Sequence, residues 1–344
     1  MYFVANKIPF IVKNTSIKKG DFLVVHPSYN DLAYNNNGGY SFYYPSHSTR
    51  TRVVSFERPW IFGKNGDPRP FYKWLNTHGY NADYICDDEM QDYPNIEQYK
   101  LLIIAGHSEY WTRNARLNFD KFVDVGKNAL ILSGNTMYWQ TRFDPNKKQL
   151  TCYKYDASYN DPIKDPLLKT TRWEDKIVKY DQRNSIGLNF FSYGGYTTMR
   201  ANDTTGFEGF KIVKPNFAIF KGMSLHLNDV IKHNSIEYDG SKVKISNNPV
   251  VGLVPEYDNT QTQFYKVDIL GWDFAIPDYG VKKKRYHAGL FLILKRKQTS
   301  GIIVNMGSSN WCNEILEKPQ LQQITANSID FLLKNKDYST EILQ

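Results

Sequence analysis

Residues 101–143 read LLIIAGHSEYWTRNARLNFDKFVDVGKNALILSGNTMYWQTRF, and this stretch decides the fold that we expect. Leu101–Ala105 and Asn128–Leu132 are short apolar runs without alternation, which is typical of strands buried on both faces. Between them, Thr112 is placed to cap a helix with one apolar face, and Gly126 is placed to end it. The stretch therefore predicts a βαβ unit in a parallel sheet.

A polar turn follows each of these two expected strands. His107 and Glu109 come after the first strand, and Asn135 comes after the second. In a right-handed βαβ unit both turns leave the same edge of the sheet, which is where open α/β sheets bind ligands. We therefore expect His107, Glu109 and Asn135 to converge in a site.

The residue types alone leave two interpretations of each of these side chains. His107 and Glu109 could bind a metal ion or act on a water as base and orienting group. As ordinary turn residues, they would instead cap the following helix and satisfy a loop carbonyl. Asn135 could hold a carbonyl oxygen, or it could simply cap its turn.

Two further segments carry side chains with useful chemistry. The stretch 32–44 is rich in tyrosine, including Tyr34 and Tyr43, and it leaves the first expected strand at the same edge. Its phenols could line a pocket, ligate a metal as phenolates, or only cover the sheet. Glu237 stands just before an Asp-Gly turn and, by pattern alone, is a surface carboxylate.

The whole sequence divides into two kinds of region, which differ in the secondary structure that they predict. Residues 1–150 and 299–344 alternate expected strands and helices, which predicts an α/β core with a doubly wound, mostly parallel sheet. Residues 151–298 hold short β-rich runs separated by Gly, Asn, Asp and Pro, so we expect an antiparallel insertion that covers the ligand edge. The expected strands of this insertion are Phe210–Val213, Phe217–Phe220, Val243–Ile245, Val250–Leu253, Phe264–Ile269 and Leu290–Leu294.

Composition narrows the classes of function. The chain has 344 residues and a formal charge of +8, but no nucleic-acid-binding module accompanies that charge, so we expect no nucleic-acid partner. No 18-residue apolar stretch and no signal pattern occur, which predicts no membrane span and a cytoplasmic location. The three cysteines form neither a disulfide framework nor a zinc spacing. A small-molecule substrate is the partner that remains.

The strongest functional indication is a resemblance carried by two motifs. Gly106-His107-x-Glu109-Tyr110-Trp111, followed by the SGNTxxWQxR pattern at 133–142, is similar to the signature of the family defined by the C-terminal region of the N,N-dimethylformamidase large chain. Further matching blocks are Ala33–Tyr43, Phe56–Pro59, Trp74–Tyr84, Gly307–Trp311 and Ile324–Asn327. The resemblance extends over nearly the whole chain.

That resemblance implies a glutamine-amidotransferase-like α/β fold without the usual cysteine nucleophile. In the formamidase, two tyrosines and a glutamate hold a mononuclear ferric ion. Carried over, Glu109 and Tyr34 match two of these ligands, and Tyr43 or Tyr72 would be the third. The residues that surround the metal in the family match His107, Asn135 and Glu237, which would act as catalytic groups.

These observations predict a hydrolase of small amides or related C–N bonds that depends on iron. A hard ferric ion suits phenolate and carboxylate oxygens, and it would polarise a carbonyl or acidify a water. Two alternatives stay open: a catalytically inactive binding or structural member of the fold, and a metal-free hydrolase of another substrate such as a carbohydrate. The characterised enzyme has a longer large chain and a small partner chain, so a small partner protein or a homo-oligomer is possible here.

Overall fold

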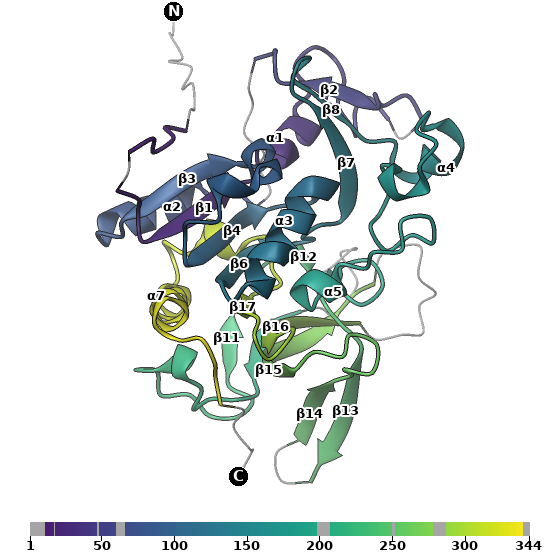
Figure 1. The fold of residues 1–344 in the computed structure, drawn as a ribbon. Helices are drawn as coiled ribbons and strands as arrows, with labels where there is room; N and C mark the ends of the chain where they lie inside the picture. The colour runs from purple at the N-terminus through teal and green to yellow at the C-terminus, as the bar shows by residue number, and fades with distance from the viewer. Residues whose placement is uncertain are drawn as a thin grey trace, which may run out of the picture.

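The computed structural model describes residues 11–16, 18–46, 48–59, 66–197, 207–249, 252–277 and 287–339. Within these ranges nine strands form one large mixed sheet in the order β11-β10-β15-β16-β17-β6-β4-β1-β3, with helices packed against it (Figure 1). The fold is therefore mixed α/β, as the sequence predicts. In the same ranges, no helix has the length and apolar character to cross a membrane.

Five strands make up the parallel half of the sheet, and they include the two apolar runs that predicted the βαβ unit. They are β1 (Phe22–His26), β3 (Ala82–Cys86), β4 (Leu101–His107), β6 (Asn128–Gly134) and β17 (Ile302–Asn305). Each pairs in parallel with its neighbour in the order β3-β1-β4-β6-β17. Strands β4 and β6 are paired from Leu101 opposite Asn128 to His107 opposite Gly134, so their carboxyl ends finish side by side.

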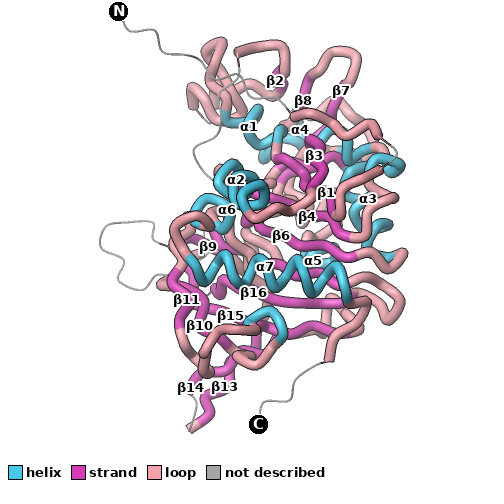
Figure 2. Tube along the Cα trace, turned by 90° about the vertical axis from the view of Figure 1, so that its left-hand side faces the viewer, coloured by secondary structure: helices cyan, strands magenta, loops and turns pink. Residues whose placement is uncertain are grey.

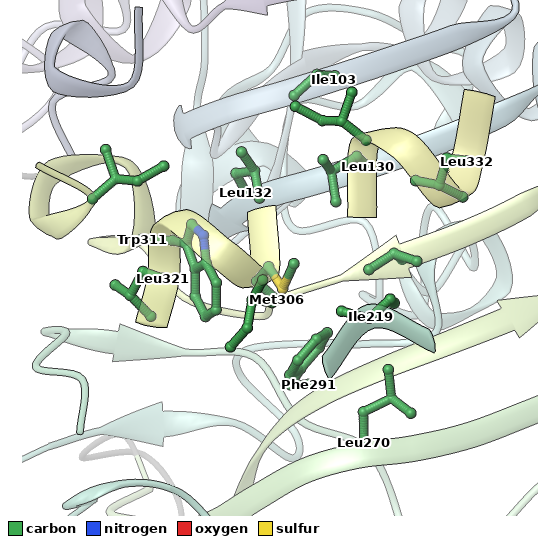
Figure 3. Packing of buried hydrophobic residues seen from close by; sticks show 14 of the residues in the cluster. Ile103, Leu130, Leu132, Ile219, Leu270, Phe291, Met306, Trp311, Leu321 and Leu332 are labelled. Atoms are coloured by element: carbon green, nitrogen blue, oxygen red, sulfur yellow. The ribbon is translucent and has the colours of Figure 1, made fainter. Parts of the chain in front are cut away.

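Helices cover both faces of the parallel half (Figure 2). They are α2 (Arg69–Thr77), α6 (Trp311–Glu314) and α7 (Pro319–Lys334) on one face, and α3 (Arg113–Asp124) on the other. Alternate residues of β4 serve the two faces: Ile103 packs in the α2/α6/α7 cluster, and Ile104 packs in the α3 cluster. Figure 3 shows the first cluster, in which Trp311 and Leu321 lie near Leu132 of β6 and near Met306, which directly follows β17. Both faces are thus apolar, which explains the unbroken hydrophobic runs.

The other half of the same sheet is antiparallel and comes from the β-rich region. It consists of β10 (Gly209–Ile212), β11 (Val230–Lys232), β15 (Lys266–Ala275) and β16 (His287–Lys295). Strand β16 pairs with β17, from Leu292 opposite Asn305 to Lys295 opposite Ile302, and this pairing joins the two halves. The strand expected at Phe217–Phe220 is wrong, because Ala218–Phe220 is a short 3-10 helix that packs against α7.

The remaining elements lie around this sheet. They are α1 (Ser28–Tyr34), β2 (Val53–Ser55), β5 (Tyr110–Thr112), β7 (Trp139–Asp144), β8 (Gln149–Thr151), α4 (Ala157–Asn160), α5 (Arg183–Ile186), β9 (Gly195–Tyr196), β12 (Glu237–Tyr238), β13 (Val243–Asn248) and β14 (Gly252–Tyr257). Strands β2, β8, β7 and β5 form a second sheet, β9 pairs with β12, and β13 pairs with β14. The β13–β14 hairpin stands out at the end of the molecule opposite β2 and β8 (Figures 1 and 2).

Candidate functional site

The predicted site residues meet at the carboxyl edge of the parallel half. His107 ends β4, Asn135 directly follows β6, and Tyr34 ends the helix that follows β1. The backbone at Gly106 has a φ of +77°, and a Cβ there would lie 2.5 Å from a backbone oxygen of Gly66, so only glycine fits this turn. The turn therefore holds His107 and Glu109 in fixed positions at the sheet edge.

Two phenols and one carboxylate form a compact cluster of oxygen atoms. The Tyr34 hydroxyl donates to Glu109 Oε1 at 2.6 Å, and the Tyr43 hydroxyl donates to Glu109 Oε2 at 3.2 Å. The two phenol oxygens lie 3.0 Å apart, and their rings stack with centroids 4.2 Å apart. The Tyr110 hydroxyl, which we do not count in this group, donates to the Tyr43 hydroxyl oxygen at 2.6 Å. We call Tyr34, Tyr43 and Glu109 the oxygen cluster.

His107 lies between two carboxylates. Its Nε2 is 2.7 Å from Glu237 Oε2 and 3.2 Å from Glu109 Oε1. Neither contact is aligned as a hydrogen bond, and within the described ranges both ring nitrogens and Glu237 Oε2 lack a hydrogen-bonded partner. Burial lowers the pKa of His107, but Glu237 and Glu109 outweigh it and raise this pKa to about 9. The imidazole is therefore held in its charged form at neutral pH.

The other polar groups at this edge are also buried. Burial raises the pKa of Glu109 and of both tyrosines, and for the tyrosines the Glu109 charge adds to the effect. Asn135 adopts a left-handed φ of 53°, and its backbone N–H donates to Asp239 Oδ1 at 2.7 Å. The side-chain oxygen of Asn135 has no hydrogen-bonded partner among the described residues. Burial raises the pKa of Asp239 to about 7.

A lysine that the sequence did not indicate lies against the oxygen cluster. Lys154 is buried, and its Nζ lies 3.3 Å from the centre of the Tyr43 ring and 5.0 Å from that of Trp139. Burial lowers the pKa of Lys154 to about 7. The ammonium group over the ring favours extra electron density on Tyr43.

These groups open into a cavity of about 630 Å³. Its lining combines the oxygen cluster, Asn135 and Glu237 with six further aromatic residues and two cationic ones. The full lining is Tyr34, Tyr43, Glu109, Asn135, Tyr138, Trp139, Lys154, Tyr155, Arg172, Phe190, Phe191, Tyr196 and Glu237. A ligand in this cavity can touch the oxygen cluster directly.

Two other groups considered from the sequence lie elsewhere. Tyr72, the alternative third ligand, sits on α2 and its hydroxyl lies 3.0 Å from His26 Nδ1, outside the oxygen cluster. All three cysteines are free, and burial raises the pKa of both Cys152 and Cys312 to about 12. A thiol of so high a pKa is a poor nucleophile at neutral pH.

The donor set of the oxygen cluster fits a small, hard cation. Ligands at right angles around an ion at about 2.0 Å are separated by about 2.8 Å, and the oxygens here lie 2.6–3.2 Å apart. Hard phenolate and carboxylate oxygens suit iron in its ferric state. No group of three or more His, Cys, Asp and Glu residues in the described ranges is arranged to hold a metal, so tyrosine oxygens are essential to this candidate.

The chain belongs to the family described as N,N-dimethylformamidase beta subunit-like, C-terminal, whose profile matches residues 4–323. The resemblance found in the motifs is thereby confirmed. A search of curated proteins finds no match.

The comparison with solved structures finds proteins of low sequence identity and low TM-score. A putative thua-like protein from Bacteroides uniformis is 12% identical, with a TM-score of 0.42, over 93% of this chain and 94% of that chain. A cytoplasmic protein from Salmonella typhimurium is 10% identical, with a TM-score of 0.41, over 90% of this chain and 98% of that chain. Likenesses at this level support no conclusion about activity.

Three site groups were missed from the sequence, with different signals available. Tyr110 is part of the GHxEYW motif, and Asp239 stands two residues after Glu237, so the sequence contained a signal for both residues. Lys154 is in no motif and reaches Tyr43 only through the return of the chain after β8. Nothing in its local sequence indicates that contact.

Proposed function

We propose that this protein hydrolyses amides or related C–N bonds at an iron centre held by Tyr34, Tyr43 and Glu109. The observation that carries the proposal is the oxygen cluster at the wall of the cavity, with oxygens 2.6–3.2 Å apart. Membership in the dimethylformamidase-like family supports the same chemistry. When bound, a ferric ion supplies Lewis acidity and compensates the charge of buried phenolates and a carboxylate.

The residues around the oxygen cluster have separate tasks in this proposal. His107 and Glu237, with 2.7 Å between Nε2 and Oε2, form a proton-holding pair beside Glu109. Asn135 lines the cavity, and its side-chain amide can donate a hydrogen bond to the substrate carbonyl oxygen. Asp239 accepts hydrogen bonds from the backbone N–H groups of Asn135 and Thr136, and so fixes the position of the Asn135 side chain.

The overall reaction is the addition of water across the amide bond. The water oxygen forms a bond to the carbonyl carbon, the C–N bond breaks, and the amine nitrogen takes a proton. Glu237 is suited to accept the proton from water and His107 to pass one to the leaving amine, because the two groups are in contact and line or adjoin the cavity. The products are a carboxylic acid and an amine.

Four further parts of the proposal concern the fold, the location, the assembly and the substrate of the protein. The parallel half of the sheet, with helices on both faces, supports a glutamine-amidotransferase-like core. We also propose a cytoplasmic location and assembly with a small partner protein or with further copies of the chain. A small molecule is the substrate.

The direct test is amide hydrolysis by the protein loaded with iron. Formamide, acetamide and N,N-dimethylformamide are offered in turn, and release of the acid and the amine is measured. Hydrolysis that requires iron is expected. A protein with one iron per chain that cleaves no amide would overturn the proposed reaction.

A further inference from the structure

One part of the cavity lining is a continuous chain of aromatic rings. Tyr155 contacts Trp139, with centroids 5.1 Å apart and an interplanar angle of 82°. Trp139 contacts Tyr138 at 4.7 Å and 82°, Tyr138 contacts Phe190 at 5.9 Å and 73°, and Phe190 contacts Tyr196 at 5.1 Å and 81°. Every contact is edge-to-face, so successive rings present faces and edges in alternation, the two arrangements that aromatic partners prefer.

Two members of this ring chain, Tyr196 and Trp139, adjoin the proposed catalytic groups. Tyr196 lies directly opposite Glu237 in the β9–β12 pairing. Trp139 is linked to the oxygen cluster through Lys154, whose Nζ lies near the rings of both Trp139 and Tyr43. A molecule resting on the rings therefore has its reactive end within reach of Glu237 and Glu109.

The charges that line the cavity favour a neutral ligand. Glu109 and Glu237 contribute two carboxylates, and Lys154 and Arg172 contribute two cations. Arg172 is already paired with Asp175 at 2.8 Å, and its guanidinium rests on the Phe191 ring. Because the charged His107 contacts both Glu109 and Glu237, the carboxylates and the cations around the cavity balance, and the site offers no net negative charge to an ammonium ligand.

The volume of the cavity indicates a substrate larger than the simplest amides. A cavity of about 630 Å³ lies in the range that accepts drug-sized molecules. A simple dialkylformamide would fill only about a quarter of it. The unfilled part is bounded mainly by rings, so an apolar, flat group is the complement of that space.

We infer that the substrate is a neutral aryl amide, such as a formanilide, whose ring rests on the Tyr155–Tyr196 ring chain while its amide faces the oxygen cluster. The inference rests on the proposed function for the reaction, but ring binding itself does not. A carbohydrate is the competing class of ligand, because the lining also holds hydrogen-bonding groups such as Glu109, Lys154 and Arg172, and the test therefore includes a sugar.

The test compares formanilide with N,N-dimethylformamide on the full chain, by both hydrolysis and calorimetric binding. We expect kcat/KM for formanilide to be about 100-fold higher, because a buried ring adds several carbon contacts to the transition state. Tyr155→Ala removes a ring at the open end of the chain, where Tyr155 is 53% exposed and truncation spares the core. This variant is expected to lose about 10-fold of the preference for the aryl amide.

Tyr159→Ala is the matched control, since Tyr159 is 91% exposed and is not part of the cavity lining. It is expected to leave the preference unchanged. If N,N-dimethylformamide is cleaved but formanilide neither binds nor reacts faster, the inference is overturned and the proposed function stands. If formanilide binds in a Tyr155-dependent way but no amide is cleaved, the aryl site stands and the proposed function fails. Binding of methyl glucoside in place of formanilide would overturn the aryl assignment.

Discussion

Two buried histidines in this protein each contact a glutamate at the same distance, yet their surroundings differ. His107 Nε2 lies 2.7 Å from Glu237 Oε2, and His233 Nδ1 lies 2.7 Å from Glu314 Oε2. The two glutamate side chains are also equally exposed, at 13% and 14%. Burial and pairing distance are therefore matched between the two pairs.

The pairs differ in whether their polar atoms are satisfied. His233 Nε2 also contacts Ser308 Oγ at 2.5 Å, and Glu314 accepts from the Asn234 backbone N–H and pairs with Lys318. The nitrogens of His107 and the Oε2 atom of Glu237 have no such partners within the described ranges. A buried polar atom without a partner costs about 1–3 kcal/mol, so the His107 pair is arranged for a ligand rather than for stability.

The pKa values of the two histidines also differ. Burial lowers the pKa of His233, whereas the carboxylates beside His107 raise its pKa to about 9. One histidine is thus kept neutral and fixed, and the other is kept charged beside a cavity. One pair therefore has a structural role and the other a functional one. Four predictions test this difference, from the largest expected effect to the smallest.

The largest effect is expected from Glu109→Gln, which removes the anionic ligand and nearly preserves shape. We expect loss of bound iron and at least a 1,000-fold loss of amide hydrolysis, because a neutral amide is a poor ligand for a ferric ion. Iron is measured by inductively coupled plasma mass spectrometry beside the rate. Glu174→Gln is the control, since Glu174 is a mostly buried glutamate bonded to Ser192 and Asn189, away from the oxygen cluster. Stoichiometric iron in Glu109→Gln would refute the ligand assignment.

Next in size is the catalytic effect of Glu237→Gln. We expect a rate loss of about 100- to 10,000-fold with iron retained, because a proton acceptor is lost but no proposed ligand is removed. Glu314→Gln should keep the full rate, since it lies in the satisfied pair. Equal rates for the two variants would erase the functional distinction between the pairs.

The stability of the same two variants should depend on pH in different ways. Glu314→Gln replaces a carboxylate that accepts hydrogen bonds from His233 and the Asn234 backbone, and we expect it to lower the free energy of unfolding by about 1–2 kcal/mol. Glu237→Gln removes a carboxylate that keeps the buried His107 charged, and we expect a loss of similar size near neutral pH that shrinks as the pH rises toward the pKa of His107 at about 9. Urea denaturation of the iron-free proteins at neutral and at alkaline pH measures both values. A loss in Glu237→Gln that does not depend on pH would contradict the comparison.

The smallest effect is a pH dependence of stability at the satisfied pair. The folded-state pKa values of both His233 and Glu314 are lowered, the first by burial with a further contribution from Lys318, the second by hydrogen bonds from His233 and Lys318 that outweigh burial. At these two groups the unfolded chain binds more protons than the folded chain as pH falls below about 6.5, so their contribution to stability decreases toward acid. Buried groups with raised pKa values, such as His107 and Asp239, act in the opposite direction, so the contribution of the pair is measured against Glu314→Gln. Below about pH 5 the denaturation midpoint of Glu314→Gln should fall less, or rise more, than that of the unchanged protein. Equal pH profiles in this range would assign the acid sensitivity to other groups.

The sequence predicted the parts of the site that depend on local pattern. The apolar runs of β4 and β6 and the glycine near the end of β4 are recognised from neighbouring residues, and they place His107 and Asn135 at one edge. The two tyrosines were proposed through a resemblance, and geometry was needed to separate Tyr43 from Tyr72. Tyr43 lies in the tyrosine-rich segment that follows β1 at the site edge, whereas Tyr72 lies on α2 beside His26.

Features that depend on pairing between distant segments of the chain could not be predicted from the sequence. The strands of the β-rich region were expected, but their place in the main sheet depends on β16 pairing with β17 across the chain. The run Phe217–Phe220 is too short for its periodicity to separate a strand from a helical turn, and its packing against α7 decides the outcome. Lys154 reaches the oxygen cluster through a similar return of the chain.

The measurement that tests the central claim most directly is the metal content of freshly purified protein, taken together with its visible spectrum. With iron held by Tyr34, Tyr43 and Glu109, we predict about one iron per chain and an absorption band from tyrosinate-to-iron charge transfer. Absence of iron and of that band, even after anaerobic reconstitution with iron, would contradict the account.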